Sequence, residues 1–554
     1  MRGWYGDLPR ETDSSDAEVL AAASVSKGLV VAGTASDTSP TSQGNGAGAS
    51  PLEFRPRTVI VASLLAAAVI ATAGSLSDIS LGDENTHVRQ ARAYAESGYR
   101  VPCDPLSSSI DDRAPKPFSA GPAWHGGLAI LWRLTGSPSQ IVAQIYQAGF
   151  YLLLLLSVYF GVRQIWGVSA ASWTWLLIAT MPMVCVYSIL LYQDVPGIAV
   201  LALALLLLWR KNFLWAGVCL GVAYLIKMNM LSYAPWAVVF AAWWAGGTWK
   251  RRLKAALGVA APVALAFGYD VSWRLMIYGH MMHPGGGDLS GLPAFAITAL
   301  QSRPEDFRVW DLFPVYNPQA VVENVGVAVI AVTPVALVRV RDVVGIWLWA
   351  CLGLAVAGFV YVFTMTEVRY LFPSLLILVL LCGKGIADWR LSPSLKAVLV
   401  AACVIQAVAA CVYTYNDRQI SEFDAAAYAW IRENAEPGTR ILVPEEVVVN
   451  QTGRSMIWWD VNPAWLMSEG TDEQIEEILR HFHVSHMAVP LRRVYDREKE
   501  GSHSGGWARE FLERARGSQC FEKVYENPGY VIFRFNPRTA SAPNGPVPGR
   551  RGPS

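Results

Sequence analysis

Two adjacent carboxylates, Asp83 and Glu84, follow the first long apolar run of the chain and open the stretch "DENTHVRQARAYAESG". If this stretch is helical, its spacing places Asp83, His87 and Gln90 on one face. A carboxylate and an imidazole on one face could take up or donate a proton in a reaction. The structural alternative is a helix cap, since an ionised Asp83 at a helix N-terminus is favoured by the helix dipole.

Isolated polar residues also interrupt later apolar segments. They are Asp194 in "YQDVPG", Lys227 and Asn229 in "IKMNML", Asp288 in "GGGDLSG", and Glu367, Arg369 and Tyr370 in "EVRYLFP". The guanidinium fork of Arg369 suits a phosphate at headgroup depth. Lys227 could instead snorkel to the membrane surface, and Asp194 could serve only a turn. Carboxylates together with isolated cations fit the transfer of a group from a lipid phosphate to a hydroxyl.

Motifs for several other chemistries are missing from the sequence. There is no P-loop, GxSxG elbow, HExxH or dinucleotide fingerprint, which argues against soluble nucleotide chemistry. A metal site would rest on His280 and His283 alone, and two histidines without a third ligand are a weak signal. We therefore expect no metal, no other cofactor and no nucleic acid partner.

The composition is that of a polytopic membrane protein. Of 554 residues, 53% are hydrophobic and 16% are charged, whereas soluble proteins carry about 25% charged residues. Several apolar runs approach the ~20 residues that span a bilayer. About eleven spans can be placed in this way: 58–76, 139–162, 169–191, 195–209, 213–228, 231–247, 255–276, 318–338, 342–364, 369–387 and 394–413.

Basic residues divide the ends of these spans into two alternating sets. The basic set consists of Arg55 and Arg57, Arg163, Arg210 and Lys211, the cluster at 250–254, and Arg339 and Arg341. The positive-inside rule assigns this set to the cytoplasm, together with the N-terminus. The opposite set is then extracytoplasmic, and it contains the long loops 77–138 and 277–317 and the C-terminal segment.

Four regions follow from this reading. Residues 1–54 and 537–554 are rich in small and polar residues and predict disordered tails. Residues 55–414 form the transmembrane domain. In the first outer loop, Pro and Gly predict an interfacial loop, with Trp124 and His125 as an interfacial anchor.

Residues 415–536 predict a small extracytoplasmic α/β domain. "ISEFDAAAYAWIRENA" and "TDEQIEEILRHFHV" have helical periodicity, whereas "TRILVPEEV", "HMAVPL" and "YVIFRF" are typical of strands, with "ENPGY" as a turn. Most cysteines lie in apolar runs as small core residues. Cys103 and Cys520 lie in polar segments, where a disulfide between them is possible but has no support.

The polar stretches resemble a known family. "DENTHVRQARAY" resembles the Asp-Glu-x-x-His-x-x-Gln-Ala-x-x-Tyr pattern of the dolichyl-phosphate-glucose α-1,2-glucosyltransferases (the DIE/ALG-ten family), which belong to the GT-C glycosyltransferases. Further matches follow in order between residues 77 and 375: Asp104-Pro105, Tyr192, Asp194-Val195, Asn229, Asp288, Ser290, Glu367, Arg369, Tyr370 and Pro373. The C-terminal domain departs from the eukaryotic pattern and is similar to bacterial GT-C enzymes.

The resemblance implies a mainly α-helical GT-C fold in a bacterial inner membrane and a hexosyltransferase reaction with inversion. The donor would be a polyprenyl-phosphate sugar, and the acceptor a hydroxyl of a lipid-linked or envelope glycan. Asp83 would be the general base, and Glu84 would position the acceptor or orient Asp83. Arg369 would bind the donor phosphate, with Lys227 and His87 as second choices. Substrate contacts would come from Gln90, Asp194, Asn229, Asp288 and Tyr370.

Other classes of membrane protein stay open. A transporter or a lipid-linked-glycan flippase would explain many spans and intramembrane charges, but not the large loops on one side. Transporters also tend to contain internal repeats, and none is found here. A different lipid-phosphate transferase and a nonenzymatic assembly protein are further alternatives.

Overall fold

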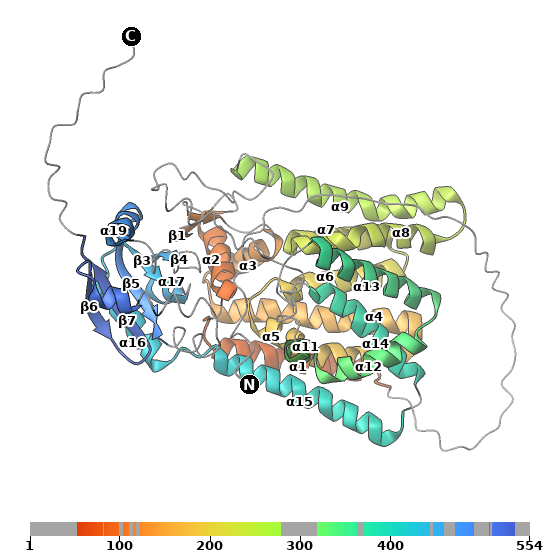
Figure 1. The fold of residues 1–554 in the computed structure, drawn as a ribbon. Helices are drawn as coiled ribbons and strands as arrows, with labels where there is room; N and C mark the ends of the chain where they lie inside the picture. The colour runs from red at the N-terminus through yellow and green to blue at the C-terminus, as the bar shows by residue number, and fades with distance from the viewer. Residues whose placement is uncertain are drawn as a thin grey trace, which may run out of the picture.

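A computed structural model of the chain describes residues 53–80, 82–98, 103–109, 115–117, 122–278, 318–362, 371–389, 391–443, 447–458, 471–491, 509 and 512–537. Apolar helices form an elongated bundle, and a sheet with its own helices sits at one end of it (Figure 1). Two helices of the first outer loop, α2 (Gly82–Ser97) and α3 (Pro122–Thr135), lie between the bundle and the sheet.

The bundle is built from long apolar helices and shorter ones. Its described members are α1 (Pro56–Leu76), α4 (Gln140–Thr180), α5 (Pro182–Ile189), α6 (Asp194–Trp209), α7 (Phe213–Ile226), the 3₁₀ helix η1 (Met228–Tyr233), α8 (Ala234–Ala245), α9 (Trp249–Tyr278), α11 (Pro318–Val325), α12 (Val327–Arg339), α13 (Val343–Val362), α14 (Phe372–Asp388) and α15 (Pro393–Asp417). Every predicted span overlaps one or more of them.

Four described helices, α1, α4, α9 and α15, are long and apolar enough to cross a membrane, and α5 with α6 makes a fifth candidate bent by 117°. The gap expected between 162 and 169 coincides with a kink in α4, where Gly167 adopts φ +84° and separates two helical segments. That left-handed conformation is inexpensive only for glycine. The number of spans stays a prediction.

Small residues allow the bundle helices to approach closely. Helix α4 packs on α1, α6 and α14, and α7 packs on α9. Between α7 and α9, a Cβ on Gly217 would lie 2.5 Å from the carbonyl oxygen of Val259, so only glycine fits without a shift. Small residues at helix contacts are typical of membrane bundles, where close packing drives association.

Residues of the predicted cytoplasmic junctions are close together in space. Arg210 Nε donates to Gln164 Oε1 at 3.2 Å, and Trp166 Nε1 donates to Asp342 Oδ1 at 3.2 Å. Trp244 Nε1 donates to the carbonyl of Trp209 at 3.2 Å. These contacts join chain segments that the charge pattern assigns to one membrane face. Which face is cytoplasmic stays a prediction.

The C-terminal domain, called the outer domain after its predicted side of the membrane, contains a seven-stranded sheet of order β2-β1-β4-β3-β5-β7-β6. Its strands are β1 (Cys103–Ser109), β2 (Pro115–Pro117), β3 (Arg440–Val443), β4 (Ser455–Trp458), β5 (Val484–Pro490), β6 (Phe521–Glu526) and β7 (Tyr530–Phe535), and its helices are α16 (Glu422–Asn434), α17 (Val447–Thr452) and α19 (Asp472–His481). The expected helices and the β6–β7 turn are confirmed, and β3, β5 and β7 overlap the expected strands, although Val447 at the end of "TRILVPEEV" begins α17. Cys520 is a free buried thiol with Sγ 3.7 Å from Glu476 Oε2.

The sheet also includes two strands that the sequence did not predict. β1 comes from the first outer loop and pairs in parallel with β4, Ser108 lying opposite Ile457. β2 pairs antiparallel with β1 at the sheet edge. Part of the loop between α2 and α3 therefore belongs to the sheet, and an interfacial role for this loop stays a prediction.

A buried ion pair joins the end of the bundle nearest the sheet to α2. Arg418, directly after α15, places Nη2 2.8 Å from Glu84 Oε1, and both side chains are 0% exposed. Nη1 of the same guanidinium donates to Ser77 Oγ at 2.6 Å and to the carbonyl of Gly74 at 3.1 Å. One side chain thus holds the end of α1, the start of α2 and the end of α15.

Replacing Arg418 by methionine should destabilise the protein strongly, because Glu84 would keep a buried charge without its counter-ion. Loss of one partner of a buried pair costs about 3–5 kcal/mol in free energy of unfolding. The measurement is reversible denaturation in detergent, compared with Lys523→Met in the exposed Lys523–Glu526 pair. That control should change stability by less than about 1 kcal/mol.

The double variant Glu84→Gln/Arg418→Met should recover most of the loss, since it removes both charges. An Arg418→Met protein as stable as the parent would contradict the structural role assigned to the buried Glu84–Arg418 pair.

Candidate functional site

Helix α2 presents Asp83 and Glu84 in its first turn, as the sequence predicts. The backbone N–H of Asp83 donates to the hydroxyl of Tyr192 at 3.1 Å, so the turn before α6 fixes the start of α2. The Asp83 side chain is half-buried. Its position is thus compatible both with a favoured place at a helix N-terminus and with access for a substrate.

Glu84 occupies a different environment from its neighbour. Its side chain is fully buried, and Oε1 accepts from the backbone N–H of Leu191 at 3.0 Å as well as from Arg418. This carboxylate is therefore held between α15 and the turn before α6. Arg418 was missed by the sequence analysis, although a lone arginine at the outer end of the last span was a usable signal.

His87 lies one turn after Asp83 and belongs to a histidine pair. Its Nδ1 is 3.0 Å from Nε2 of His125, and Nδ1 of His125 is 3.2 Å from Nε2 of Gln193. The expectation of an interfacial anchor at Trp124 and His125 is wrong. Both side chains are 0% exposed, and Trp124 Nε1 donates to Gln147 Oε1 at 3.2 Å.

Gln90 shares the helix with Asp83 and is fully buried. Its Nε2 donates to the hydroxyl of Tyr94 at 3.0 Å, one turn further along α2. Tyr94 is itself 1% exposed. Gln90 therefore packs inside the protein in this structure, and its contact with a substrate stays a prediction.

The structure brings Asp194 and Lys227 together as an ion pair. Asp194 begins α6 and its side chain is 2% exposed, while Lys227 follows α7 and its side chain is 14% exposed. The start of α6 packs closely on this segment, since a Cβ on Gly197 would lie 2.8 Å from Cε of Met230 and 3.6 Å from Cβ of Lys227. Asn229 lies two residues beyond Lys227, in η1, and is half-buried.

A second buried acid–base pair borders the same segment. Arg274 Nε donates to Asp270 Oδ2 at 3.0 Å, and the hydroxyl of Tyr224 donates to the same oxygen at 2.6 Å. Arg274 Nη2 also contacts Sδ of Met228 at 3.1 Å. The sequence analysis passed over this pair, although two charges four residues apart inside the apolar run of α9 were visible.

The remaining predicted site residues, Asp288, Arg369 and Tyr370, lie outside the described residues, as do Glu367, His280 and His283. Their roles stay predictions. Among the residues that the structure describes, the site thus consists of α2, α3, the turn before α6, and the ends of α6 and α7.

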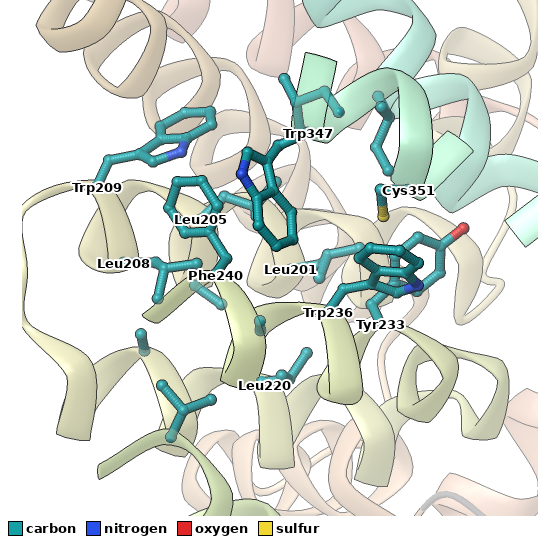
Figure 2. A pocket seen from close by; sticks show the side chains of 16 residues that line it. Leu201, Leu205, Leu208, Trp209, Leu220, Tyr233, Trp236, Phe240, Trp347 and Cys351 are labelled. Atoms are coloured by element: carbon teal, nitrogen blue, oxygen red, sulfur yellow. The ribbon is translucent and has the colours of Figure 1, made fainter. Parts of the chain in front are cut away.

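An apolar pocket lies in the bundle on the same side of α6 as Asp194 and Gly197. It is lined by side chains of α6, α7, α8, α9, α13 and α14 together with Tyr233 of η1. Figure 2 shows Trp209, Phe240 and Trp347 grouped toward one end, with Trp236, Tyr233 and Cys351 toward the other. Along α6, Leu201, Leu205 and Leu208 continue the helix face that begins at Asp194 and Gly197.

Residues 121–273 match a family model described as dolichyl-phosphate-mannose-protein mannosyltransferase. This segment includes His125, Asp194 and Lys227. The sugar in this family description is mannose, so the match gives no support to the narrower resemblance to α-1,2-glucosyltransferases. No curated protein matches the chain by sequence.

Solved structures resemble the chain over most of its length. The apo structure of ArnT from Cupriavidus metallidurans has a TM-score of 0.56 and 14% identity, covering 86% of this chain and 97% of that one. ArnT bound to undecaprenyl phosphate gives a TM-score of 0.56 and 12% identity, covering 87% and 98%. The oligosaccharyltransferase AglB from Archaeoglobus fulgidus, in complex with an inhibitory peptide and a dolichol-phosphate, gives 0.53 and 13%, covering 87% and 75%. The chain is therefore a multi-pass membrane protein with the GT-C fold.

Proposed function

We propose that this protein is a membrane glycosyltransferase that moves a hexose from a polyprenyl-phosphate donor to a hydroxyl of a lipid-linked or envelope glycan. The observation that carries the proposal is the grouping of a half-buried carboxylate, Asp83, with the turn that leads into the Asp194–Lys227 pair. The GT-C fold supports it, because ArnT and AglB have been solved with undecaprenyl phosphate and dolichol-phosphate.

Asp83 acts as the general base in this proposal. It takes the proton of the acceptor hydroxyl while the oxygen attacks the anomeric carbon from the face opposite the phosphate. The bond between that carbon and the phosphate oxygen breaks, the phosphate leaves with the bonding electrons, and the configuration inverts. General-base assistance is worth about 10²–10⁴-fold in rate.

Lys227 supplies positive charge to the departing phosphate, together with Arg369. Asp194 holds the ammonium group at the end of α7, where the Lys227 side chain is still 14% exposed. A cation fixed in place before the reaction costs no reorganisation when negative charge develops. The ion pair thus acts as a prepared support for the phosphate rather than as a freely moving lysine.

The apolar pocket accommodates part of the prenyl chain. Its lining continues from the α6 face below Asp194, so a lipid with its phosphate near Lys227 could extend along Leu201 and Leu205. Aromatic and aliphatic walls suit an isoprenoid, which offers no hydrogen-bonding groups.

The proposal specifies the sugar only as a hexose and the acceptor only as a glycan hydroxyl. The sequence resemblance implies glucose, and the matched family description names mannose. An assay must therefore offer both prenyl-phosphate hexoses, with a lipid extract of the source membrane as acceptor.

Replacing Asp83 by asparagine should lower transfer by about 10²–10⁴-fold, because the amide cannot take the proton. The measurement is transfer of labelled hexose by purified protein in detergent. Glu96→Gln, an exposed carboxylate near the end of the same helix, is the matched control and should leave the rate unchanged.

Undiminished transfer by a folded Asp83→Asn protein would exclude the assigned base. Movement of the labelled substrate across proteoliposomes without product would instead favour the transporter alternative.

Lys227→Met should weaken binding of the prenyl-phosphate donor by roughly 10- to 100-fold, since a hydrogen bond to a charged group is worth about 1.5–3 kcal/mol. Donor titration by inhibition with undecaprenyl phosphate measures this. The double variant Asp194→Asn/Lys227→Met separates binding from folding, because it removes the buried charge that the single variant leaves. Recovery of donor affinity in the double variant would contradict a phosphate role for Lys227.

Ala237→Trp should fill the pocket and lower affinity for undecaprenyl phosphate at least about tenfold, since each excluded methylene is worth about 0.8 kcal/mol. Affinity for a geranyl phosphate analogue should stay unchanged, because its short chain needs less of the pocket. Val239→Trp on the exposed face of the same helix is the control. Equal affinity of Ala237→Trp for both lipids, at the parent level, would place the chain elsewhere.

A further inference from the structure

A chain of hydrogen-bonding side chains runs from α2 to the turn before α6. It starts at His87, passes through His125 on α3 and ends at Gln193, with N–N distances of 3.0 and 3.2 Å. His125 is 0% exposed and Gln193 is 6% exposed. The resemblance gave His87 only a possible phosphate contact and gave His125 and Gln193 no role.

We propose that His125 is a positioning residue that holds His87 in a single neutral tautomer beside Asp83. The inference rests on the proposed function, because it assigns His87 a part in the same site. It concerns the location of one proton, which can be measured without any turnover.

The hydrogen-bond donors and acceptors of Gln193, His125 and His87 determine which ring nitrogen of His87 carries the proton. Gln193 presents its amide nitrogen to Nδ1 of His125, and an amide nitrogen only donates. His125 therefore carries its proton on Nε2 and donates it to Nδ1 of His87. His87 then carries its own proton on Nε2, since the hydrogen bond at one ring nitrogen fixes the tautomer at the other.

Aromatic packing holds both rings in orientation. His87 stands edge-on to Trp124 and to Tyr192, with ring centroids 5.9 and 5.6 Å apart. His125 stands edge-on to Trp124 at 5.1 Å and to Tyr94 at 6.3 Å. Because the Tyr192 hydroxyl also accepts from the backbone of Asp83, one short turn positions both the carboxylate and the histidine chain.

The consequence for the reaction is a fixed division of roles. His87 is a neutral N–H donor at Nε2, while its Nδ1 is occupied by His125 and does not compete with Asp83 for the acceptor proton. His87 lies one helical turn after Asp83, on the same face of α2 as the proposed base.

The test is ¹⁵N NMR of histidine-labelled protein in detergent, combined with transfer kinetics. The parent should show His87 protonated at Nε2 and unprotonated at Nδ1. His125→Leu should give His87 a mixture of tautomers and lower kcat roughly 10-fold with little change in donor KM, as for other residues that orient a functional imidazole. His125→Gln keeps an N–H near the position of Nε2 and should restore both signals.

Gln193→Glu tests the polarity of the chain. A carboxylate accepts from Nδ1 of His125, so both histidines should reverse and His87 should become protonated at Nδ1. His486→Gln, which removes a buried histidine of the outer domain bonded to Ser485, is the matched control and should alter neither readout.

An unchanged His87 tautomer in both His125→Leu and Gln193→Glu would overturn the inference, whatever the transfer rate. The expected tautomer changes in a protein that transfers no hexose would uphold the positioning and overturn the proposed function. Loss of folding in His125→Leu would leave the decision to His125→Gln and Gln193→Glu.

Discussion

The buried pair between Glu84 and Arg418 is the constraint on which the outer half of the molecule depends. Two charges removed from water are stable only when each has partners, and Arg418 has them on α1, α2 and the segment before α6. The first and last described bundle helices therefore end at one point. The Glu84–Arg418 pair also positions the candidate site, because Asp83 directly precedes Glu84 in α2.

The outer domain contacts the segment around Glu84 and Arg418 directly. Strand β1 leaves the first outer loop to pair with β4, and Asn450 of α17 donates to Asn85, the residue after Glu84. The backbone N–H of Ile420 donates to Asp78 at 2.9 Å. Helix α2 is thus held at its start, along its length and beyond its end. Such fixation suits a site that needs preorganised groups.

The local sequence predicted most of the elements, whereas β1, β2 and the contacts of the site residues depend on distant parts of the chain. Helix α2 follows from its spacing, and the strand β7 follows from its alternating apolar residues. Strand β1, "CDPLSSS", has weak strand propensity and depends on pairing with β4. Arg418 lies 334 residues from Glu84, so no local pattern connects them. His125 looked like an interfacial residue because composition does not reveal burial at a helix crossing.

Two adjacent carboxylates at the start of one helix repel each other unless the charge of one is compensated. The two side chains differ in burial, and only Glu84 is fully buried. Glu84 is turned inward and neutralised by Arg418, while Asp83 stays half-buried beside the turn at Tyr192. In the proposed reaction, Glu84 paired with Arg418 secures the helix without adding a net negative charge near the departing phosphate. A Glu84 carboxylate without this counter-ion would repel the phosphate whose negative charge Lys227 is proposed to stabilise.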